Sequence, residues 1–380
     1  MLVRVLAKTR AVGRLGRRWA SALLGLLAFA VAGPAFAQSA DEAFDAAVRQ
    51  ALAASGAPGL TVAVASGSRM LFARAYGRLR QGEDAPVEPG DPFRLVSISK
   101  PMTATLIGVL VDGGVLRWDE TPAEVWPEAA AAMNPAMAKI TLEQLLRHRA
   151  GVAAYTDAVD LDAAPKFSND ATEQRAALAL WLLHRRPAYR AGEFHYSNAG
   201  YGLAAAMAEK ATGESWEALM RERLFRPLGL ESCGFGWPDA RDRRWPSGHR
   251  YDNGRFIPGG SKRDPLGGLP LIAPAVDISC DGADLARFGQ TWLTGAPGLL
   301  KPETFRRMAE GGTGWTVESG TLYHLGGDGT FHGALFVMPR SDLVVAVMVN
   351  AGTGRPGSAV LNRTVAAAVR LYGKGPDAKP

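Results

Sequence analysis

The sequence predicts an α/β fold of the α+β type, in which an antiparallel sheet is flanked by helices and carries an inserted, mostly helical lobe. Strand-like segments occur between residues 60 and 76 and return after residue 320, while the middle of the chain has helical periodicity. A sheet built from both ends of a chain encloses the middle as an insertion. A cleft between two such lobes is a usual place for a small-molecule site.

Residues 1–37 have the pattern of a secretory signal peptide. They contain six basic residues and no acidic one, and an apolar run from Trp19 to Ala32 leads to Ala35-Phe36-Ala37. The run is short for a membrane-spanning helix, although an uncleaved anchor is the alternative. Cleavage after Ala37 predicts an exported protein, periplasmic or secreted, with no stable membrane span. The Arg17-Arg18 pair leaves both the Sec and the twin-arginine routes open.

Composition excludes several classes of partner. Beyond residue 37 the chain has 37 basic and 37 acidic residues, so its charge favours neither nucleic acid nor an anionic membrane.

An oxidising compartment would allow a disulfide between Cys233 and Cys280. Two cysteines in so long a chain are, however, more often separate buried apolar residues. No C-x-x-C or H-E-x-x-H spacing occurs, so we predict no metal and no cofactor.

The elements of the first third alternate between apolar periodicity and Gly- or Pro-rich turns. The expected order is a helix over 41–54, strands over 60–66 and 70–76, a loop over 78–92 and a helix over 97–111. Glycines follow both helices, as Gly56 and as Gly113-Gly114, and mark their ends.

The rest of the chain divides into a helical middle and a strand-rich end. We expect helices over 140–148, 170–184, 199–212 and 215–225, an irregular loop over 236–266, strands over 321–324, 331–338 and 343–350, and a last helix over 356–372. The predicted domain spans residues 38–372, with a sheet lobe over about 41–125 and 266–372, a helical lobe over about 126–265, and a tail over 373–380.

Ser97 and Lys100 form an S-x-x-K pair at the start of a predicted helix. Residues three apart on a helix share a face, so the lysine can reach the serine hydroxyl. A serine needs a neighbouring base to act as a nucleophile, and a lysine serves if burial keeps it neutral. Free N–H groups at the helix start would favour a developing oxyanion. A solvated helix start with no function is the alternative.

Tyr196 and Asn198 flank Ser197 just before another predicted helix. A tyrosine can act as an acid or a base, and an asparagine can hold a substrate carbonyl. An ordinary helix cap is the alternative, since Ser and Asn both cap well. The third segment, His324-Leu325-Gly326-Gly327, lies on a late strand where glycines would let a substrate approach the backbone closely.

The order and spacing of these three segments resemble the serine β-lactamase and penicillin-binding superfamily, which uses S-x-x-K, Y-x-N and a K-T-G or H-x-G strand. The flanking sequences Ala57–Val64, Leu145–Gly151 and Phe225–Leu230 resemble the family too. The Y-x-N form is most similar to class C β-lactamases and family VIII esterases. The resemblance covers about residues 45–372 and implies a β-lactamase/transpeptidase-like fold.

The resemblance implies an acyl-enzyme on Ser97, with Lys100 and Tyr196 sharing the proton handling and the first base left open. The oxyanion would lie between the backbone N–H groups of Ser97 and Gly327. Asn198 and His324 would bind substrate. No cofactor is implied, and the partner would be a small acyl substrate such as an ester, amide or peptide.

The third segment departs from K-T-G at the two positions that meet a penicillin carboxylate. His324, with an ordinary pKa near 6.5, is only about a quarter protonated at pH 7, and Leu325 has no donor. A neutral ester or amide is therefore favoured. A class C-like β-lactamase or D,D-peptidase is the first alternative, and a catalytically silent binding protein is the second.

Four further residues lie near these segments. Tyr155 is predicted either to contact substrate at the cleft mouth or to pack in the core. His332 is expected on the strand beside His324, although we do not expect the two to bind a metal. His195 should point away from Tyr196, and His148 should pack structurally.

Overall fold

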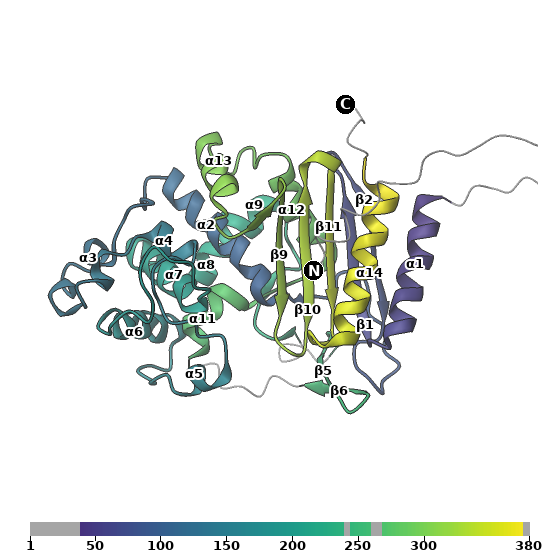
Figure 1. The fold of residues 1–380 in the computed structure, drawn as a ribbon, viewed down its shortest axis with the longest axis horizontal. Coiled ribbons are helices and arrows are strands. Elements are labelled where there is room, and N and C mark those ends of the chain that lie inside the picture. Colours follow the sequence, from purple (N-terminus) through teal and green to yellow (C-terminus); the bar gives the residue numbers. More distant parts are fainter. Residues whose placement is uncertain (1–38, 239–243, 260–267, 375–380) are drawn as a thin grey trace, which may run out of the picture.

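The structure is a computed structural model that describes residues 39–238, 244–259 and 268–374. The predicted signal peptide and most of the predicted tail lie outside these residues. Figure 1 shows a sheet with two helices on one face and the helix-rich part of the chain on the other. Within the described residues, no helix is both long and apolar enough to cross a membrane.

A six-stranded antiparallel sheet is formed by segments from both ends of the chain, as the strand pattern predicts. Its strand order is β2-β1-β11-β10-β9-β8. The strands are β1 (Gly59–Ala65), β2 (Met70–Gly77), β8 (Thr316–Glu318), β9 (Thr321–Gly327), β10 (His332–Met338) and β11 (Leu343–Val349). All residues of β1 and β11 are buried, because helices cover both faces of the sheet at its centre. This explains why β11 reads as an unbroken apolar run instead of an alternating one.

Helices α1 (Ala40–Ser55) and α14 (Arg355–Tyr372) lie side by side on the outer face of the sheet (Figure 1). They enclose one apolar core with the outward side chains of the strands. Ser39 and Glu42 form a capping box that fixes the start of α1. Helices α2 (Ser99–Asp112), α12 (Gly282–Leu293) and α13 (Pro302–Gly311) contribute to a larger core on the inner face.

The middle of the chain is helical, as expected. Its helices are α3 (Pro122–Val125), α4 (Leu142–Leu146), α5 (Ala158–Asp162), α6 (Ala171–Leu183), α7 (Asn198–Thr212), α8 (Trp216–Met220) and α9 (Arg226–Leu228). Helix α11 (Leu269–Val276) lies in the stretch predicted for the sheet lobe but packs against α6 and α7. A π-helical turn over Arg221–Phe225 joins α8 to α9. The fully buried Trp216 packs in the same core as the inner face of the sheet, so the helical part and the sheet share one apolar interior.

The region predicted as an irregular loop over 236–266 contains a hairpin. Its strands are β5 (Gly248–Asp252) and β6 (Arg255–Gly259). Asn253 and Gly254, at its tip, both have positive φ, which is the geometry of a type I′ turn. The prediction was wrong for this part because the many charged and Pro residues around it obscured the Asn-Gly turn signal. Residues 239–243 and 260–267 of the predicted loop lie outside the described residues.

Cys233 and Cys280 form a disulfide, so the expectation of two separate thiols was wrong. The small sheet β3-β7-β4, with β3 (Phe93–Arg94), β4 (Gly234–Phe235) and β7 (Ile278–Cys280), brings them together. Gly234 pairs with Ser279, which places the preceding cysteine opposite the following one across the ladder. The same sheet leads through β3 directly to Ser97.

Candidate active site

Ser97 lies in a short 3-10 turn, Val96–Ile98, between β3 and α2. The predicted helix therefore begins two residues later than expected, at Ser99. Val96 has a φ of 49°, a left-handed conformation that is strained for a β-branched residue. The turn is anchored by the Leu95 N–H, which donates to the carbonyl of Ile278, and by the Ile98 N–H, which donates to Leu95. The serine is thus presented on a rigid turn instead of on the helix itself.

The hydroxyl of Ser97 lies between the two side chains that the sequence motifs predict as its partners. Lys100 Nζ is 3.1 Å from Ser97 Oγ, and Tyr196 Oη is 2.9 Å from the same atom. Lys100 comes from the first turn of α2, and Tyr196 precedes α7. Residues 99 positions apart in the sequence therefore converge on one oxygen atom.

Lys100 is fully buried, and burial lowers its pKa well below the ordinary value of 10.5. Among the described residues Lys100 makes no salt bridge. Besides Ser97 Oγ, its Nζ lies 3.2 Å from the carbonyl of Ala275 and over the rings of Tyr196 and Tyr201, at 4.7 and 5.7 Å from their centroids. With no carboxylate beside it, the lysine is held towards its neutral form, whose lone pair can accept a proton.

Burial has the opposite consequence for Tyr196, because it raises the pKa of the phenol to about 12. The phenol therefore stays protonated and donates its hydrogen bond to Ser97. The sequence left open whether Lys100 or Tyr196 is the first base. The two pKa shifts favour the lysine as the base and the tyrosine as a proton donor.

His148 packs against this pair. Its Nδ1 accepts a hydrogen bond from the N–H of Ser197 at 3.1 Å, and its ring centroid is 4.5 Å from that of Tyr196. Burial lowers the pKa of His148 to about 3, so it is neutral. His195, as predicted, is directed elsewhere: it stacks on Tyr189 with ring centroids 4.0 Å apart.

Asn198 differs in detail from its predicted role of holding a substrate carbonyl. One N–H of its amide donates to the carbonyl of Tyr155 at 2.8 Å. Its Oδ1 is buried and has no hydrogen-bond partner within the described residues. The unused group is therefore an acceptor, which suits an N–H or O–H donor of a substrate.

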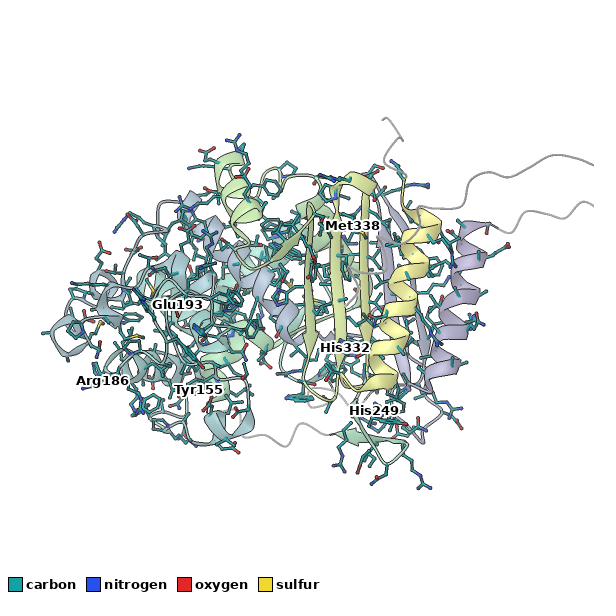
Figure 2. The ribbon with its side chains drawn as sticks, in the orientation of Figure 1. Tyr155, Arg186, Glu193, His249, His332 and Met338 are labelled. Carbon is teal, nitrogen blue, oxygen red and sulfur yellow. A yellow bond between two sulfur atoms is a disulfide. The ribbon has the colours of Figure 1, made fainter. Side chains whose placement is uncertain are left out.

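Tyr155 was predicted either to contact substrate at the cleft mouth or to pack in the core, and in the structure it packs in the core. The side chain is 6% exposed and packs in the inner apolar core, in the helical half of the molecule (Figure 2). Its φ of 50° turns the backbone so that the carbonyl, and not the ring, meets Asn198.

His324 lies on β9 and is buried more deeply than its motif position suggested. Nδ1 is 3.0 Å from the carbonyl of Gly314, so the N–H is on Nδ1 and Nε2 carries the lone pair. Burial lowers the pKa of His324 to about 3. The expectation of a quarter-protonated ring at pH 7 was therefore wrong, and the ring is neutral. Leu325, next to it, is 46% exposed.

Gly326 allows β9 to pass directly against the turn that carries Ser97. A Cβ at this position would lie 2.1 Å from the carbonyl oxygen of Leu95. No other residue type fits there without separating the two backbones. Gly327 follows and pairs with His332 of β10, at one end of that strand (Figure 2). The predicted second oxyanion donor is thus on the strand that packs against the turn carrying Ser97.

Within residues 39–238, 244–259 and 268–374, no group of three or more His, Cys, Asp or Glu side chains could hold a metal ion. His332, which the sequence placed on the strand beside His324, is buried in the sheet half of the molecule. The site residues that the sequence could not indicate are backbone groups, the carbonyls of Ala275 and Gly314, which no side-chain motif marks.

Comparison with known proteins indicates the family to which the chain belongs. The family model described as Beta-lactamase matches residues 44–370. Penicillin-binding protein 4 of Amycolatopsis lactamdurans is 27% identical over 310 residues, covering 73% of this chain and 77% of that protein. The β-lactamase of Escherichia coli K12 is 27% identical over 238 residues, and the match spans 62% of this chain but only 56% of that protein.

The solved structure of EstCE1, described as a hydrolase with promiscuous acyltransferase activity, matches with a TM-score of 0.71 at 20% identity. The match covers 87% of this chain and 99% of that one. At this identity the similarity shows the fold alone. Together with the family match, it confirms the β-lactamase/transpeptidase-like fold predicted from the three motifs.

Proposed function

Because the chain belongs to the Beta-lactamase family and is a serine hydrolase of the esterase/β-lactamase type, we propose that it forms an acyl-enzyme on Ser97 and hydrolyses a neutral carboxylic ester, or less readily an amide, after export. The observation that carries the proposal is the position of Ser97 Oγ, 3.1 Å from a buried lysine and 2.9 Å from a protonated tyrosine.

In the proposed acylation, neutral Lys100 accepts the proton of Ser97 as Oγ forms a bond to the substrate carbonyl carbon. The backbone N–H groups of Ser97 and Gly327 hold the oxyanion, and each such donor is commonly worth about 3–4 kcal/mol of transition-state stabilisation. Collapse of the intermediate breaks the ester C–O bond, and the leaving alkoxide takes a proton from Tyr196, which is re-protonated by the ammonium of Lys100. Deacylation repeats these steps in reverse. Tyr196 passes its proton to Lys100 and takes one from the attacking water, and the ammonium of Lys100 then protonates Ser97 Oγ as its bond to the acyl group breaks.

Three features support a neutral substrate. His324 is uncharged and presents a lone pair, so a carboxylate near it would meet no cation. The exposed side chain of Leu325 is apolar where a hydroxyl would be needed. Asn198 Oδ1 is a free acceptor that a substrate anion would not satisfy. An uncharged ester with a hydrogen-bond donor near its acyl group fits all three.

The test is a substrate panel of p-nitrophenyl esters, nitrocefin and D-alanyl-D-alanine peptides, run beside Ser97→Ala. We expect ester turnover that Ser97→Ala abolishes, with β-lactam turnover far slower. Nitrocefin turnover at the ester rate would favour the β-lactamase or D,D-peptidase reading, which the Amycolatopsis and Escherichia relatives also suggest. Failure of a fluorophosphonate probe to label Ser97 would favour a silent binding protein.

Export is part of the proposal and is supported by the signal-peptide pattern of residues 1–37 and by the Cys233–Cys280 disulfide. Cell fractionation together with N-terminal sequencing of the purified protein tests it. A periplasmic or secreted product starting at Gln38 is expected, and an uncleaved cytoplasmic product would refute it.

A further inference from the structure

Two carbonyl groups near the end of α11 accept hydrogen bonds from side chains of α2. Ala275 O accepts from Lys100 Nζ at 3.2 Å, and Pro274 O accepts from Thr103 Oγ1 at 2.7 Å. Thr103 lies one turn after Lys100 and is fully buried. The place of α11 relative to α2 therefore decides where the amine of the lysine can lie.

Thr103 is itself held by a donor from a third helix. The indole N–H of Trp216 donates to Thr103 Oγ1 at 3.2 Å, which turns the hydroxyl proton towards Pro274. Trp216 is fully buried at the start of α8. The Trp216 indole, the Thr103 hydroxyl and the Pro274 carbonyl thus form a continuous chain of hydrogen bonds. Pro274 directly precedes Ala275, whose carbonyl binds Lys100.

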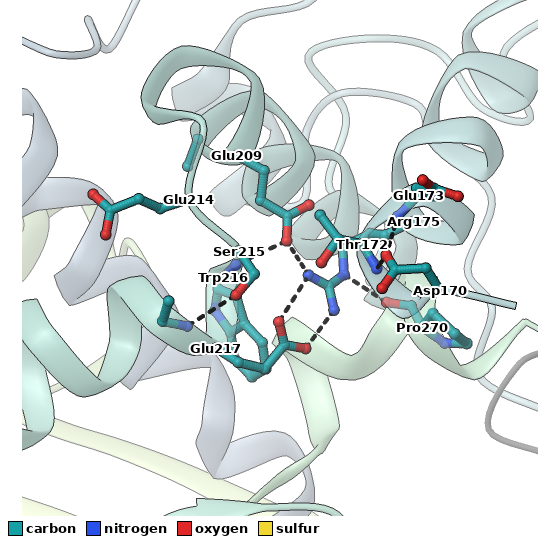
Figure 3. A network of polar contacts seen from close by, with 12 residues as sticks. Asp170, Thr172, Glu173, Arg175, Glu209, Glu214, Ser215, Trp216, Glu217 and Pro270 are labelled. Carbon is teal, nitrogen blue, oxygen red and sulfur yellow. Dashed lines mark hydrogen bonds and ion pairs between the residues drawn. The ribbon is translucent and has the colours of Figure 1, made fainter. Parts of the chain in front are cut away.

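The other end of this chain is an ion-pair network (Figure 3). The backbone N–H of Trp216 donates to Glu209 Oε1 at 2.8 Å, and the same carboxylate pairs with Arg175. Arg175 also pairs with Glu217 at 2.6 Å and donates through Nε to the carbonyl of Pro270 at 2.8 Å. One fully buried guanidinium therefore binds the first turn of α11 and, through the two carboxylates, the first turn of α8.

We propose that Thr103 and Trp216, anchored by the Arg175 network, are positioning residues that hold the Ala275 carbonyl so that Lys100 Nζ faces Ser97. This inference rests on the proposed function, in which the lysine is the base. A buried carbonyl that loses its donor is unfavourable, so α11 would shift to find another. Since the same segment carries the carbonyl partner of the lysine, the shift reaches the amine and lowers the rate of the chemical step.

Thr103→Val tests this directly, because it removes the hydroxyl and keeps the shape of the side chain. We expect kcat for ester hydrolysis to fall about tenfold or more, since small misplacements of reacting groups carry penalties of this size. KM should stay within twofold, because the substrate-facing side chains of β9 are untouched. Thr103→Ser keeps the hydroxyl and should restore kcat to within about twofold of the wild type.

The chain offers a matched control on the same helix. Trp292 Nε1 donates to Thr105 Oγ1 at 3.1 Å, but Thr105 donates to Pro101 O within α2 at 2.7 Å and not to α11. Trp292→Phe and Thr105→Val remove the same kinds of bond from equally buried positions. They should lower Tm as Trp216→Phe and Thr103→Val do, and leave kcat within twofold.

Equal losses of kcat in the two pairs, or an unchanged kcat in folded Thr103→Val, would overturn the inference. The double variant Thr103→Val/Trp216→Phe should lose no more kcat than Thr103→Val alone, since both act through one carbonyl. If Thr103→Val does not fold, the test is the kcat of Trp216→Phe compared with that of Trp292→Phe. A loss confined to Trp216→Phe supports the inference, and equal values overturn it. Absence of Ser97-dependent activity in the wild type would instead refute the proposed function, which is a separate outcome.

Discussion

Gly326→Ala should move β9, which carries the proposed oxyanion donor Gly327, away from the proposed nucleophile Ser97. The added Cβ would lie 2.1 Å from the Leu95 carbonyl oxygen, whereas ordinary contact begins at about 3.4 Å, so β9 and the turn before Ser97 must move apart by roughly 1 Å. Both groups are backbone and cannot rotate away. A displacement of this size commonly costs about 100-fold, and loss of one oxyanion donor costs about 100- to 1000-fold. We therefore expect kcat to fall by about 100- to 1000-fold.

The assay is p-nitrophenyl ester hydrolysis, with Tm measured in parallel. Gly333→Ala is the control, since Gly333 lies directly opposite Gly326 on β10 and its added Cβ would meet Met348 Sδ at 2.1 Å. The Met348 side chain can rotate, and the nearest backbone atom, the carbonyl oxygen of Val347, is 3.1 Å from the added Cβ and needs to give by only a few tenths of an ångström. We therefore expect a loss of about 1–3 kcal/mol in unfolding free energy and kcat within twofold. A native kcat in folded Gly326→Ala, or equal losses in both variants, would refute this account of how β9 meets the nucleophile.

Three further predictions concern β9 and the disulfide. The double variant His324→Lys/Leu325→Thr should lower KM for a carboxylate-bearing ester by tenfold or more and leave KM for its methyl-capped analogue unchanged; an equal KM for both would contradict the proposed neutral preference. Burial lowers the pKa of His324 to about 3, so between about pH 6.5 and 3 the unfolded chain binds a proton that the folded chain does not, and stability falls as pH falls through this window. His324→Gln should therefore lose about 1.4 kcal/mol less per pH unit than the wild type between pH 6 and pH 4 in urea unfolding, and parallel losses would exclude a neutral buried ring. Breaking the Cys233–Cys280 bond, which closes a loop with a sequence separation of 47, by Cys233→Ala/Cys280→Ala should lower the unfolding free energy by up to about 4 kcal/mol, and an unchanged midpoint in guanidinium would show that the bond adds nothing.

The sequence predicts those features that depend on local pattern. The apolar runs of β1 and β11 follow from strand geometry and reappear in the structure. The predicted contact between Ser97 and Lys100 is also present, although Ser97 lies on a 3-10 turn and not on the helix. The Asn253-Gly254 pair is also a local turn signal, but the charged and Pro residues around it led us to predict an irregular loop there.

What the sequence could not predict depends on contacts between distant backbone groups. The disulfide depends on the pairing of Gly234 with Ser279, which no spacing rule reveals. The tautomer of His324 depends on the carbonyl of Gly314, and the placement of Lys100 depends on the carbonyl of Ala275. Such carbonyls belong to every residue type, so their role appears only once the fold brings them to the site.

Helices α1 and α14 place both described ends of the chain together, on the face of the sheet that is turned away from Ser97 (Figure 1). The hydroxyl of Tyr372 donates to Asp41 Oδ1 at 2.7 Å, which ties the last helix to the first. A label, a fusion partner or a solid support attached close to Ser39 or Lys374 would therefore lie behind the sheet, on the side opposite Ser97. Immobilised protein should accordingly keep its access to bulky acyl substrates.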